Sequence, residues 1–530
     1  MKAEEMKALL ADHISLRQLL FPKGYLFTDD ENIDEKEYPF YGEWKKIDFF
    51  NYKFLIHPKQ NFYISKNERN GMALVGHAFD PVDPKGSISE EIMLSEALLL
   101  YEKSESEFTE LFNRWTGLFA LFVFDNGKLR LYGDPAGMYM AFYGSCNGKR
   151  YCSSHTNLLG DVCGLQFDEY VERLINYRFY SLFGKALPGD LSPYKQFKRL
   201  IPNHFAEFGE DDEWTVKRFF PTDENSLVEL RYDEIIDRSA GILSRSMQLI
   251  HQKWNRAAIS LTGGCDSKTT LSCTNGAYDK YDYFSYISSD SEQVDAVAAK
   301  KICDMIGVSH KTYEISNNDE DYHDISSLRA IMEYNSGNIG KTNANDVRKR
   351  AFFLNQNDFD VEVKSWVSEI VRAYYHKRFA KKSFPAKLTP KYATSLYKVF
   401  ITDRKLVHDT EKIFADFLKK YYSDESFNKI PWYDLFFWEF RMSSWNGLVI
   451  TGEQQIAYDI AIPYNNRVLL QLLLSTPVEK RVKDEPHWDI MRKMNRDIAD
   501  CGISVTNIKH TNRRAKFEKL YLELSSKLPF

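Results

Sequence analysis

The stretch 257–268 reads AAISLTGGCDSK, and it decides how the C-terminal half of the chain is expected to fold. Residues 257–262 form a short apolar run of the kind found in a central parallel strand. The pair Gly263-Gly264 lets the backbone turn sharply and bring its N–H groups close to an anion. Asp266 and Ser267 follow at the place where a helix N-cap is expected. The segment therefore predicts a buried strand, a phosphate-binding turn and the start of a helix.

The side chains of this turn indicate a nucleotide bound together with a metal ion. Thr262 and Ser267 offer hydroxyl groups, and the positive end of the following helix favours an anion. Asp266 is an acidic residue in a loop otherwise built for phosphate, as expected if it holds Mg²⁺ against the phosphate oxygens. The spacing is not that of the Gly-x-x-x-x-Gly-Lys-[Ser/Thr] loop used for γ-phosphate transfer. An ordinary strand-turn-helix containing two glycines is the structural alternative.

A strand followed by Ser/Thr-Gly-Gly-x-Asp-Ser resembles the pyrophosphate loop of ATP-pyrophosphatases, which cleave ATP between the α and β phosphates and leave AMP on a carboxylate. Residues 283–287 predict the next strand of a βαβ unit, and the sequence here resembles the asparagine synthetase family. The resemblance implies ATP and Mg²⁺ as cofactors. It also implies that the backbone at Tyr286 and Ile287 contacts adenine. The ATP and pyrophosphate positions of the loop are then Ser260, Leu261, Thr262, Gly263, Gly264, Asp266, Ser267 and Lys268.

A third element lies at residues 361–375, which predict a strand running into a turn and a helix. The asparagine synthetase family carries Ser-Gly-x-Gly-Ala-Asp-Glu here, and its acidic residue binds Mg²⁺ and pyrophosphate. A gap-free match places Glu369 on that aspartate, as a second metal ligand beside Asp266, and includes Trp366 among the ATP-binding positions. Val367 occupies one of the family's glycine positions. A glutamate that only complements a helix dipole is the alternative.

The N-terminal part predicts a different architecture. Residues 118–124 and 128–132 predict two strands joined by a turn at 125–127, and further short strands follow. Their order resembles the class II glutamine amidotransferase domain that precedes the synthetase domain in asparagine synthetases. We therefore expect residues 1–220 to form a degenerate domain of this class, a β-rich sandwich like that of the Ntn hydrolases, with residues 1–50 as an extension.

The nucleophile of such amidotransferases is a cysteine at the mature N-terminus, whose own α-amino group acts as the base. This chain begins Met1-Lys2-Ala3-Glu4, and its first cysteine is Cys146. A thiol deep in the domain cannot use the terminal amine. Glutaminase activity is therefore expected to be absent.

Residues 228–530 are expected to form an ATP-pyrophosphatase domain, with a parallel sheet like that of the adenine nucleotide α-hydrolases and a helical C-terminal part. The family places catalytic lysines before an Ile-Leu-Arg helix, where this chain has Glu485-Pro486-His487-Trp488. Lys483 or His487 is the candidate catalytic substitute, and a solvated histidine is the plain alternative. The segment 460–467 resembles the family's approach to the adenylate. A basic cluster further on is either a solvated face or a strap over phosphates: Lys509, His510, Arg513, Arg514 and Lys516.

Composition gives no indication of a nucleic-acid or lipid partner. The 70 basic and 75 acidic residues leave a net charge of −5, and the pI is near 6.2. The seven cysteines form no Cys-x-x-Cys pair, which favours reduced thiols and a cytoplasmic protein. No apolar run reaches transmembrane length. The expected fold class is thus α/β and α+β in two domains.

Together these features predict an ATP-dependent carbon–nitrogen ligase that adenylates a carboxylate and lets an amine displace AMP. β-Lactam synthetases and lasso-peptide macrocyclases share this resemblance, and there the amine belongs to the substrate. A small molecule or peptide with a carboxylate and an amine is the expected substrate, with a homodimer or a biosynthetic partner protein as possible assemblies. Two alternatives stay open: amidation of a sugar acid with ammonia from solution or a partner, and a degenerate protein that binds a nucleotide or a partner without catalysis.

Overall fold

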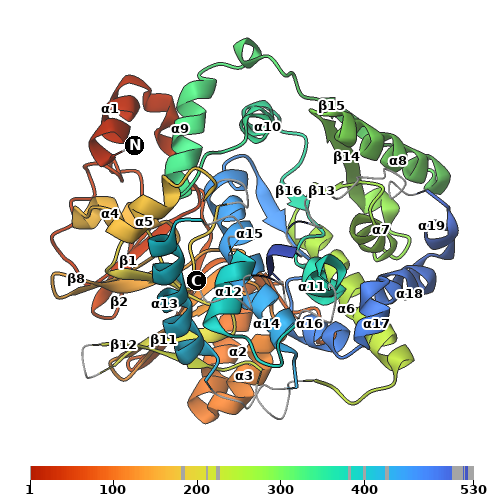
Figure 1. Ribbon diagram of the computed structural model, residues 1–530, viewed down its shortest axis with the longest axis horizontal. Coiled ribbons are helices and arrows are strands. Elements are labelled where there is room, and N and C mark those ends of the chain that lie inside the picture. Colours follow the sequence, from red (N-terminus) through yellow and green to blue (C-terminus); the bar gives the residue numbers. More distant parts are fainter. Residues whose placement is uncertain are drawn as a thin grey trace.

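The computed structural model describes residues 2–86, 88–180, 185–209, 213–221, 227–379, 384–397, 402–423, 429–503, 517, 520–522 and 524. Two antiparallel sheets build the N-terminal part, and a parallel sheet with many helices builds the C-terminal part (Figure 1). The expected fold class is therefore confirmed.

The N-terminal part contains two sheets of six strands each. In spatial order, the first consists of β10 (Phe197–Arg199), β8 (Phe142–Cys146), β9 (Lys149–Ser153), β1 (Tyr25–Thr28), β3 (Tyr52–Ile56) and β2 (Lys45–Phe49). The second consists of β12 (Trp214–Arg218), β11 (His204–Phe208), β7 (Lys128–Gly133), β6 (Thr116–Asp125), β5 (Asn70–Phe79) and β4 (Phe62–Lys66). Strand β1 lies inside the sheet, so the region 1–50 contributes to the sandwich.

Local sequence explains how these sheets pair. The β6–β7 hairpin turns at Asn126 and Gly127, whose φ angles of 46° and 90° suit the tight turn that an Asn-Gly pair favours. Aromatic rings fill the space between the sheets: the ring centroid of Phe122 lies 4.6 Å from that of Phe27 and 4.9 Å from that of Phe54. Helix α2 (Glu90–Lys103) packs on β4 and β5, and α4 (Thr156–Cys163) packs on β9. Helices thus cover the outer faces of the sandwich.

The C-terminal sheet has the strand order β15 (Lys311–Glu314), β14 (Tyr281–Ile287), β13 (Ala257–Ser260), β16 (Val361–Val363) and β17 (Asp459–Ala461), with every neighbouring pair parallel. Apolar residues recur at helical spacing between positions 232 and 254 and predict a helix, and the structure has α6 (Tyr232–Lys253) there. The first helices around the sheet are α7 (Cys265–Ser272), α8 (Asp290–Ile306), α9 (Ile325–Asn335) and α10 (Ala344–Leu354). Because β13 is the middle strand, its carboxyl end lies at the centre of one edge of the sheet.

Further helices complete both parts. In the N-terminal part these are α1 (Ala3–Asp12), η1 (Ile14–Leu19), α3 (Glu105–Asn113) and α5 (Glu169–Ile175). In the C-terminal part they are η4 (Tyr278–Lys280), η5 (Asp319–Asp321), η6 (Ser368–Arg372), α11 (Tyr374–Arg378), α12 (Pro390–Tyr397), α13 (Arg404–Tyr421), α14 (Trp432–Phe436), η8 (Phe437–Met442), α15 (Ser443–Val449), η9 (Ile450–Gln454), α16 (Arg467–Leu474), α17 (Val478–Val482), α18 (Glu485–Met494) and α19 (Arg496–Asp500). No helix within these described ranges is long and apolar enough to cross a membrane.

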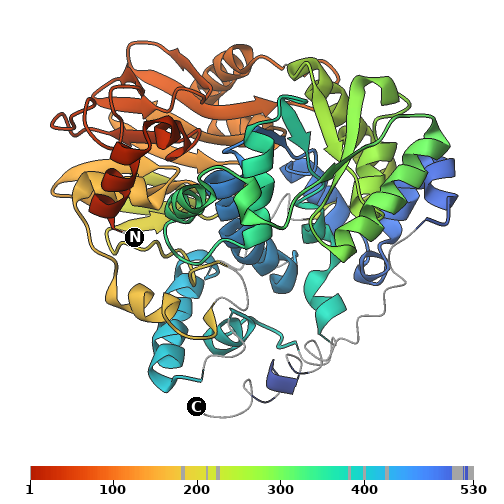
Figure 2. The same ribbon diagram turned by 90° about the horizontal axis from the view of Figure 1, so that it is seen from above.

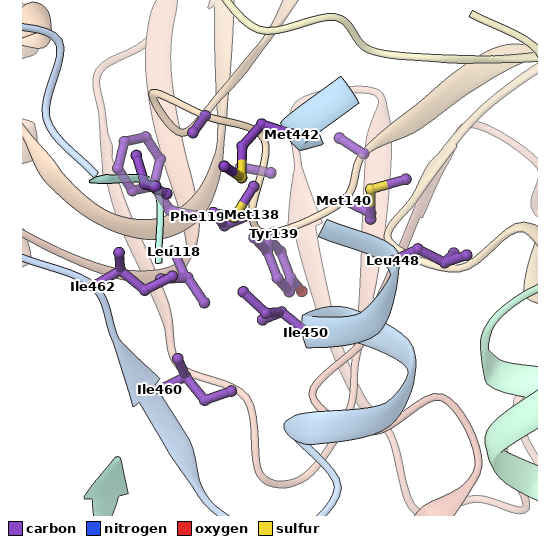
Figure 3. Packing of buried hydrophobic residues seen from close by; sticks show 14 of the residues in the cluster. Leu118, Phe119, Met138, Tyr139, Met140, Met442, Leu448, Ile450, Ile460 and Ile462 are labelled. Carbon is purple, nitrogen blue, oxygen red and sulfur yellow. The ribbon is translucent and has the colours of Figure 1, made fainter. Parts of the chain in front are cut away.

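The two parts lie against each other (Figure 2), and their buried hydrophobic residues belong to one continuous cluster. Leu118 of the second antiparallel sheet and Met140 beyond it belong to the same cluster as Leu448 and Ile450 of the helical region and Ile460 of β17 (Figure 3). A shared core of this kind holds the N-terminal sandwich against the parallel-sheet domain without relying on the linker.

Polar contacts also cross the boundary between the two parts. Asn465 Nδ2 donates to Asp134 Oδ1 at 2.9 Å and to the Gly117 carbonyl at 2.7 Å. Arg467 Nε donates to Asn203 Oδ1 at 3.1 Å. The segment 460–467, which the family resemblance placed on the approach to the adenylate, thus ends in residues buried against the N-terminal part.

Candidate active site

The glycine turn follows β13 at the carboxyl edge of the parallel sheet, where open α/β sheets place their ligands. Helix α7 begins at Cys265 with Gly264 as its N-cap, so the N-cap lies two residues before the expected Asp266. The reason is that Ser267 turns its hydroxyl back and donates to the Thr262 carbonyl at 3.0 Å. Thr262 Oγ1 in turn accepts from the Gly264 N–H at 3.2 Å. These contacts hold the turn in a defined shape.

The turn opens into a cavity of about 770 Å³. This volume lies in the upper part of the roughly 300–1,000 Å³ range of small-molecule sites. Its walls come from the β13–α7 turn, the end of β14, the loop after β16, the α9–α10 connection and the run from η8 to η9. The predicted ATP-binding residues on its wall are Ser260, Leu261, Thr262, Gly264, Asp266, Ser267, Tyr286 and Trp366.

Asp266 stands at the centre of a charged cluster on this wall. Its carboxylate accepts a hydrogen bond from Ser368 Oγ at 2.7 Å and is paired with the guanidinium of Arg372. Arg372 also pairs with Asp484 at 2.7 Å. Burial alone would lower the pKa of Arg372, but the carboxylates of Asp484 and Asp266 outweigh it and raise that pKa. Arg372 is therefore a fixed cation beside Asp266.

Glu369 lines the same cavity and is open to it. Burial raises the pKa of Glu369, and the nearby negative charge of Asp266 raises it further. Two carboxylates that repel each other in one cavity form an arrangement that a divalent cation would relieve.

The backbone at Val367 has the conformation of a glycine. Val367 has φ 74° and ψ −30°, a region that a β-branched residue rarely adopts. This is one of the two positions at which the family resemblance expects glycine. The predicted strand at 361–367 consequently ends at Val363, and the remaining residues form the cavity wall.

Two groups that would meet phosphates already have partners within the protein. The Gly263 N–H donates to Asp295 Oδ1 at 3.1 Å, and burial raises the pKa of this carboxyl. Lys364 lines the cavity next to the turn, with its ammonium 2.6 Å from Glu362 Oε1 and 5.2 Å from the centroid of the Trp366 ring. Burial lowers the pKa of Lys364, although Glu362 counteracts part of this shift.

The structure places the other predicted residues outside the cavity lining. The Lys268 ammonium donates to the Ile503 carbonyl at 2.8 Å, and the Ile287 carbonyl accepts from the Ile315 N–H at 2.9 Å. His487 is buried, with Nε2 3.7 Å from Asp266 Oδ1, and burial lowers its pKa to about 4. Lys483 is exposed, with its ammonium 3.6 Å from Glu485 Oε1.

The predicted basic cluster lies outside the described residues: Lys509, His510, Arg513, Arg514 and Lys516.

The donor set fits Mg²⁺ rather than a metal held by protein ligands alone. No group of three or more His, Cys, Asp or Glu side chains gathers as a metal site in the described ranges. Mg²⁺ commonly takes only one or two carboxylates and fills its remaining positions with water and phosphate oxygens. Asp266 and Glu369 would supply those two carboxylates.

Sequence reasoning missed several charged residues of the cavity. Lys364, directly after β16, and Arg350 of α10 line it, and Lys185 reaches it from the N-terminal part. Glu362 and Lys364 alternate with valines in a predicted buried strand, and this unusual pattern was the available signal. Lys185 and Arg350 gave no such signal, because their neighbours are brought together only by the fold.

Comparison of the sequence with protein families and with curated proteins gives no match. Among solved structures, one similar chain is described as the allosteric regulatory enzyme of purine biosynthesis, with 10% identity, a TM-score of 0.23 and coverage of 59% of this chain and 63% of that one. Another is glutamine phosphoribosylpyrophosphate amidotransferase from B. subtilis, complexed with ADP and GMP, with 10% identity, a TM-score of 0.22 and coverage of 71% and 75%. A third is glutamine-dependent NAD⁺ synthetase from Acinetobacter baumannii with ADP, with 13% identity, a TM-score of 0.20 and coverage of 45% and 49%.

This chain therefore spans less than two thirds of the first of these structures and about half of the third. Sequence identities of 10–13% and TM-scores of 0.20–0.23 carry no functional assignment.

Proposed function

We propose that this protein is an ATP-dependent, AMP-forming carbon–nitrogen ligase similar to the asparagine synthetases. The observation that carries the proposal is the meeting of the glycine turn, Asp266 and Glu369 in one cavity at the carboxyl edge of the parallel sheet. Thr262, Gly264 and Ser267 would hold the pyrophosphate end of ATP, since they line the cavity beside the N-terminal end of α7, where the helix dipole favours an anion. Tyr286, at the end of the adjacent strand β14, is suited to the adenine side.

In the proposed reaction a substrate carboxylate attacks the α-phosphorus of ATP, pyrophosphate leaves, and an amine then displaces AMP. Mg²⁺ bound by Asp266 and Glu369 would neutralise charge on the departing pyrophosphate. The protein itself would contribute the positive end of α7 and the ammonium of Lys364, a residue that lines the cavity.

The second step has three candidates for the missing family lysine. Lys483 and His487 come from the sequence, and Lys364 comes from the cavity lining. The buried imidazole of His487 is neutral at physiological pH, because its pKa of about 4 lies well below 7. It can therefore accept a proton but cannot supply a positive charge. Lys364 is the candidate that combines charge with a place in the cavity.

In this proposal the amine and the carboxylate both come from small molecules or peptides. Cys146, the first cysteine, is a buried residue of strand β8. A cytoplasmic location, and a homodimer or a biosynthetic partner protein, belong to the same proposal. Amidation of a sugar acid with ammonia remains its nearest variant.

A second candidate function is nucleotide binding without catalysis. It is favoured by the pairing of Asp266 with Arg372 and by the bond from the Gly263 N–H to Asp295, since each engages a group that Mg²⁺ or phosphate would use. ATP would have to displace both contacts before the site could work.

Calorimetric titration of ATP with and without Mg²⁺ separates these functions. Wild type, Asp266→Ala and Asp282→Ala should be compared. Asp282 is the control because it is an exposed aspartate of β14 that does not line the cavity. The ligase requires Mg²⁺-dependent binding that Asp266→Ala loses and Asp282→Ala keeps. ATP binding that depends neither on Mg²⁺ nor on Asp266 supports nucleotide binding without catalysis. No ATP binding by wild type contradicts both.

A further inference from the structure

The end of the cavity formed by the run from η8 to η9 is built on an irregular helix. The regular helix α15 is flanked by two π-helical turns, η8 and η9, and such turns are rare and often mark functional sites. The residues of this run that line the cavity are Met442, Trp445, Asn446, Val449, Glu453 and Gln454. Met442, Trp445 and Val449 are apolar and form a wall, whereas Glu453 and Gln454 add polar groups to this end of the cavity.

Two hydrogen-bond acceptors at this end lack partners in the described part of the chain. Glu453 Oε1 accepts from Thr342 Oγ1 at 3.2 Å and from Ser336 Oγ at 3.3 Å, and it is paired with the Lys185 ammonium. Its second oxygen, Oε2, receives no hydrogen bond from the described residues. Gln454 is 8% exposed, and its Oε1 is buried without a described partner. An unmatched buried acceptor costs free energy, and a ligand that donates hydrogen bonds would recover it.

The chemistry of this end selects the ligand. A carboxylate or phosphate has no hydrogen to donate, so it would leave both Glu453 Oε2 and Gln454 Oε1 unmatched. A primary ammonium brings positive charge and three donors, which suits a carboxylate oxygen and an amide oxygen on adjacent residues. The side chains of Met442, Trp445 and Val449 would enclose an apolar stem. We infer that this end of the cavity binds a primary ammonium group carried on an apolar stem.

The N-terminal part completes this site. Lys185 donates to Thr342 Oγ1 at 2.7 Å and pairs with Glu453 Oε1, so it fixes the carboxylate with Oε2 left for the ligand. Tyr180, from the same segment, also lines the cavity. The amidotransferase-like sandwich would thus serve to position the acceptor end of the cavity. This inference rests on the proposed function, in which the ligand is the amine that displaces AMP.

The test uses phenethylamine as the ammonium probe and 2-phenylethanol as its neutral counterpart, titrated into the full-length protein with and without ATP and Mg²⁺. Gln454→Leu removes one acceptor without breaking an ion pair. Gln455→Leu is the matched control, because Gln455 is equally buried and has an unpartnered Oε1 but does not line the cavity. Glu453→Gln tests the charge directly.

We expect phenethylamine to bind saturably and 2-phenylethanol at least tenfold more weakly. Gln454→Leu should weaken phenethylamine binding several-fold, Glu453→Gln should weaken it tenfold or more, and Gln455→Leu should leave it unchanged. The inference is overturned if phenethylamine does not bind, if the alcohol binds equally well, or if Gln454→Leu and Gln455→Leu behave alike. Titrating ATP into the same samples separates the two ideas: ATP binding without amine binding overturns only this inference, whereas amine binding without ATP binding overturns only the proposed ligase.

Discussion

The strained backbone at Val367 yields a quantitative prediction. This residue is fully buried and holds φ at 74°, while the next residue, Ser368, donates to Asp266 at 2.7 Å. A non-glycine residue in such a conformation costs about 1–3 kcal/mol, and the surrounding structure has to impose it. The strain therefore accompanies a turn that brings Ser368 and Glu369 toward the carboxylate of Asp266, which we propose as a metal ligand.

Val363 in β16 offers a matched comparison, because it is also fully buried but lies in an extended strand. Val→Gly at either site removes the same side chain and raises the backbone entropy of the unfolded chain by the same amount. Burial of a valine contributes about 1.5–3 kcal/mol, and the glycine backbone adds a cost of about 0.5–1 kcal/mol. Val363→Gly should therefore destabilise by about 2–4 kcal/mol. At Val367 the same change also releases the strain, so its cost should be smaller by about 1–3 kcal/mol.

The assay is urea unfolding of wild type, Val363→Gly and Val367→Gly, followed by circular dichroism in the same buffer. The free energy of unfolding of the Val367→Gly protein should exceed that of the Val363→Gly protein by at least 1 kcal/mol. Equal losses at the two sites would show that the backbone at Val367 is not strained, and a larger loss at Val367 would refute the reasoning outright. ATP titration of both variants would then show whether relaxing this turn weakens the site.

Three further predictions concern other parts of the molecule. Burial lowers the pKa of His155 to about 3, below the 6.5 of an unfolded histidine, so the unfolded chain binds this proton more readily. The free energy of unfolding therefore falls as the pH drops below 6.5, and this group accounts for a loss of about 2 kcal/mol between pH 7 and pH 5. Urea unfolding at both pH values should show a correspondingly smaller loss for His155→Asn than for wild type. Asn465→Ala leaves the buried Asp134 carboxylate without its side-chain donor, so the free energy of unfolding should fall by about 1–3 kcal/mol. An unchanged midpoint of urea unfolding would contradict this contact between the two parts. Arg372→Met removes the cation that pairs with Asp266. In a thermal scan, MgCl₂ alone should therefore raise the melting temperature of this variant more than that of wild type. Equal shifts would show that Arg372 and Mg²⁺ do not compete for Asp266.

Local sequence was sufficient for much of the fold. The β6–β7 hairpin, strand β14, helix α6 and the strand-turn-helix at β13 and α7 occur where the pattern predicts them. Hydrophobic periodicity and the turn residues act over a few positions, and these elements depend on little else. The extent of β16 was predicted less well, because the turn at Val367 uses a conformation that valine disfavours and the surrounding packing imposes.

The glycine turn and the place of Asp266 at the start of the next helix were therefore determined by the sequence alone, since this local conformation depends on neighbours in the chain. Tertiary structure decided what surrounds them. Arg372 meets Asp266 although their residue numbers differ by 106, and Lys185 meets Glu453 although theirs differ by 268. Neither pair has a local pattern, because the partners are brought together only by the packing of sheets and helices against one another. That long-range packing also left Lys483 on the surface and placed Lys364 at the turn.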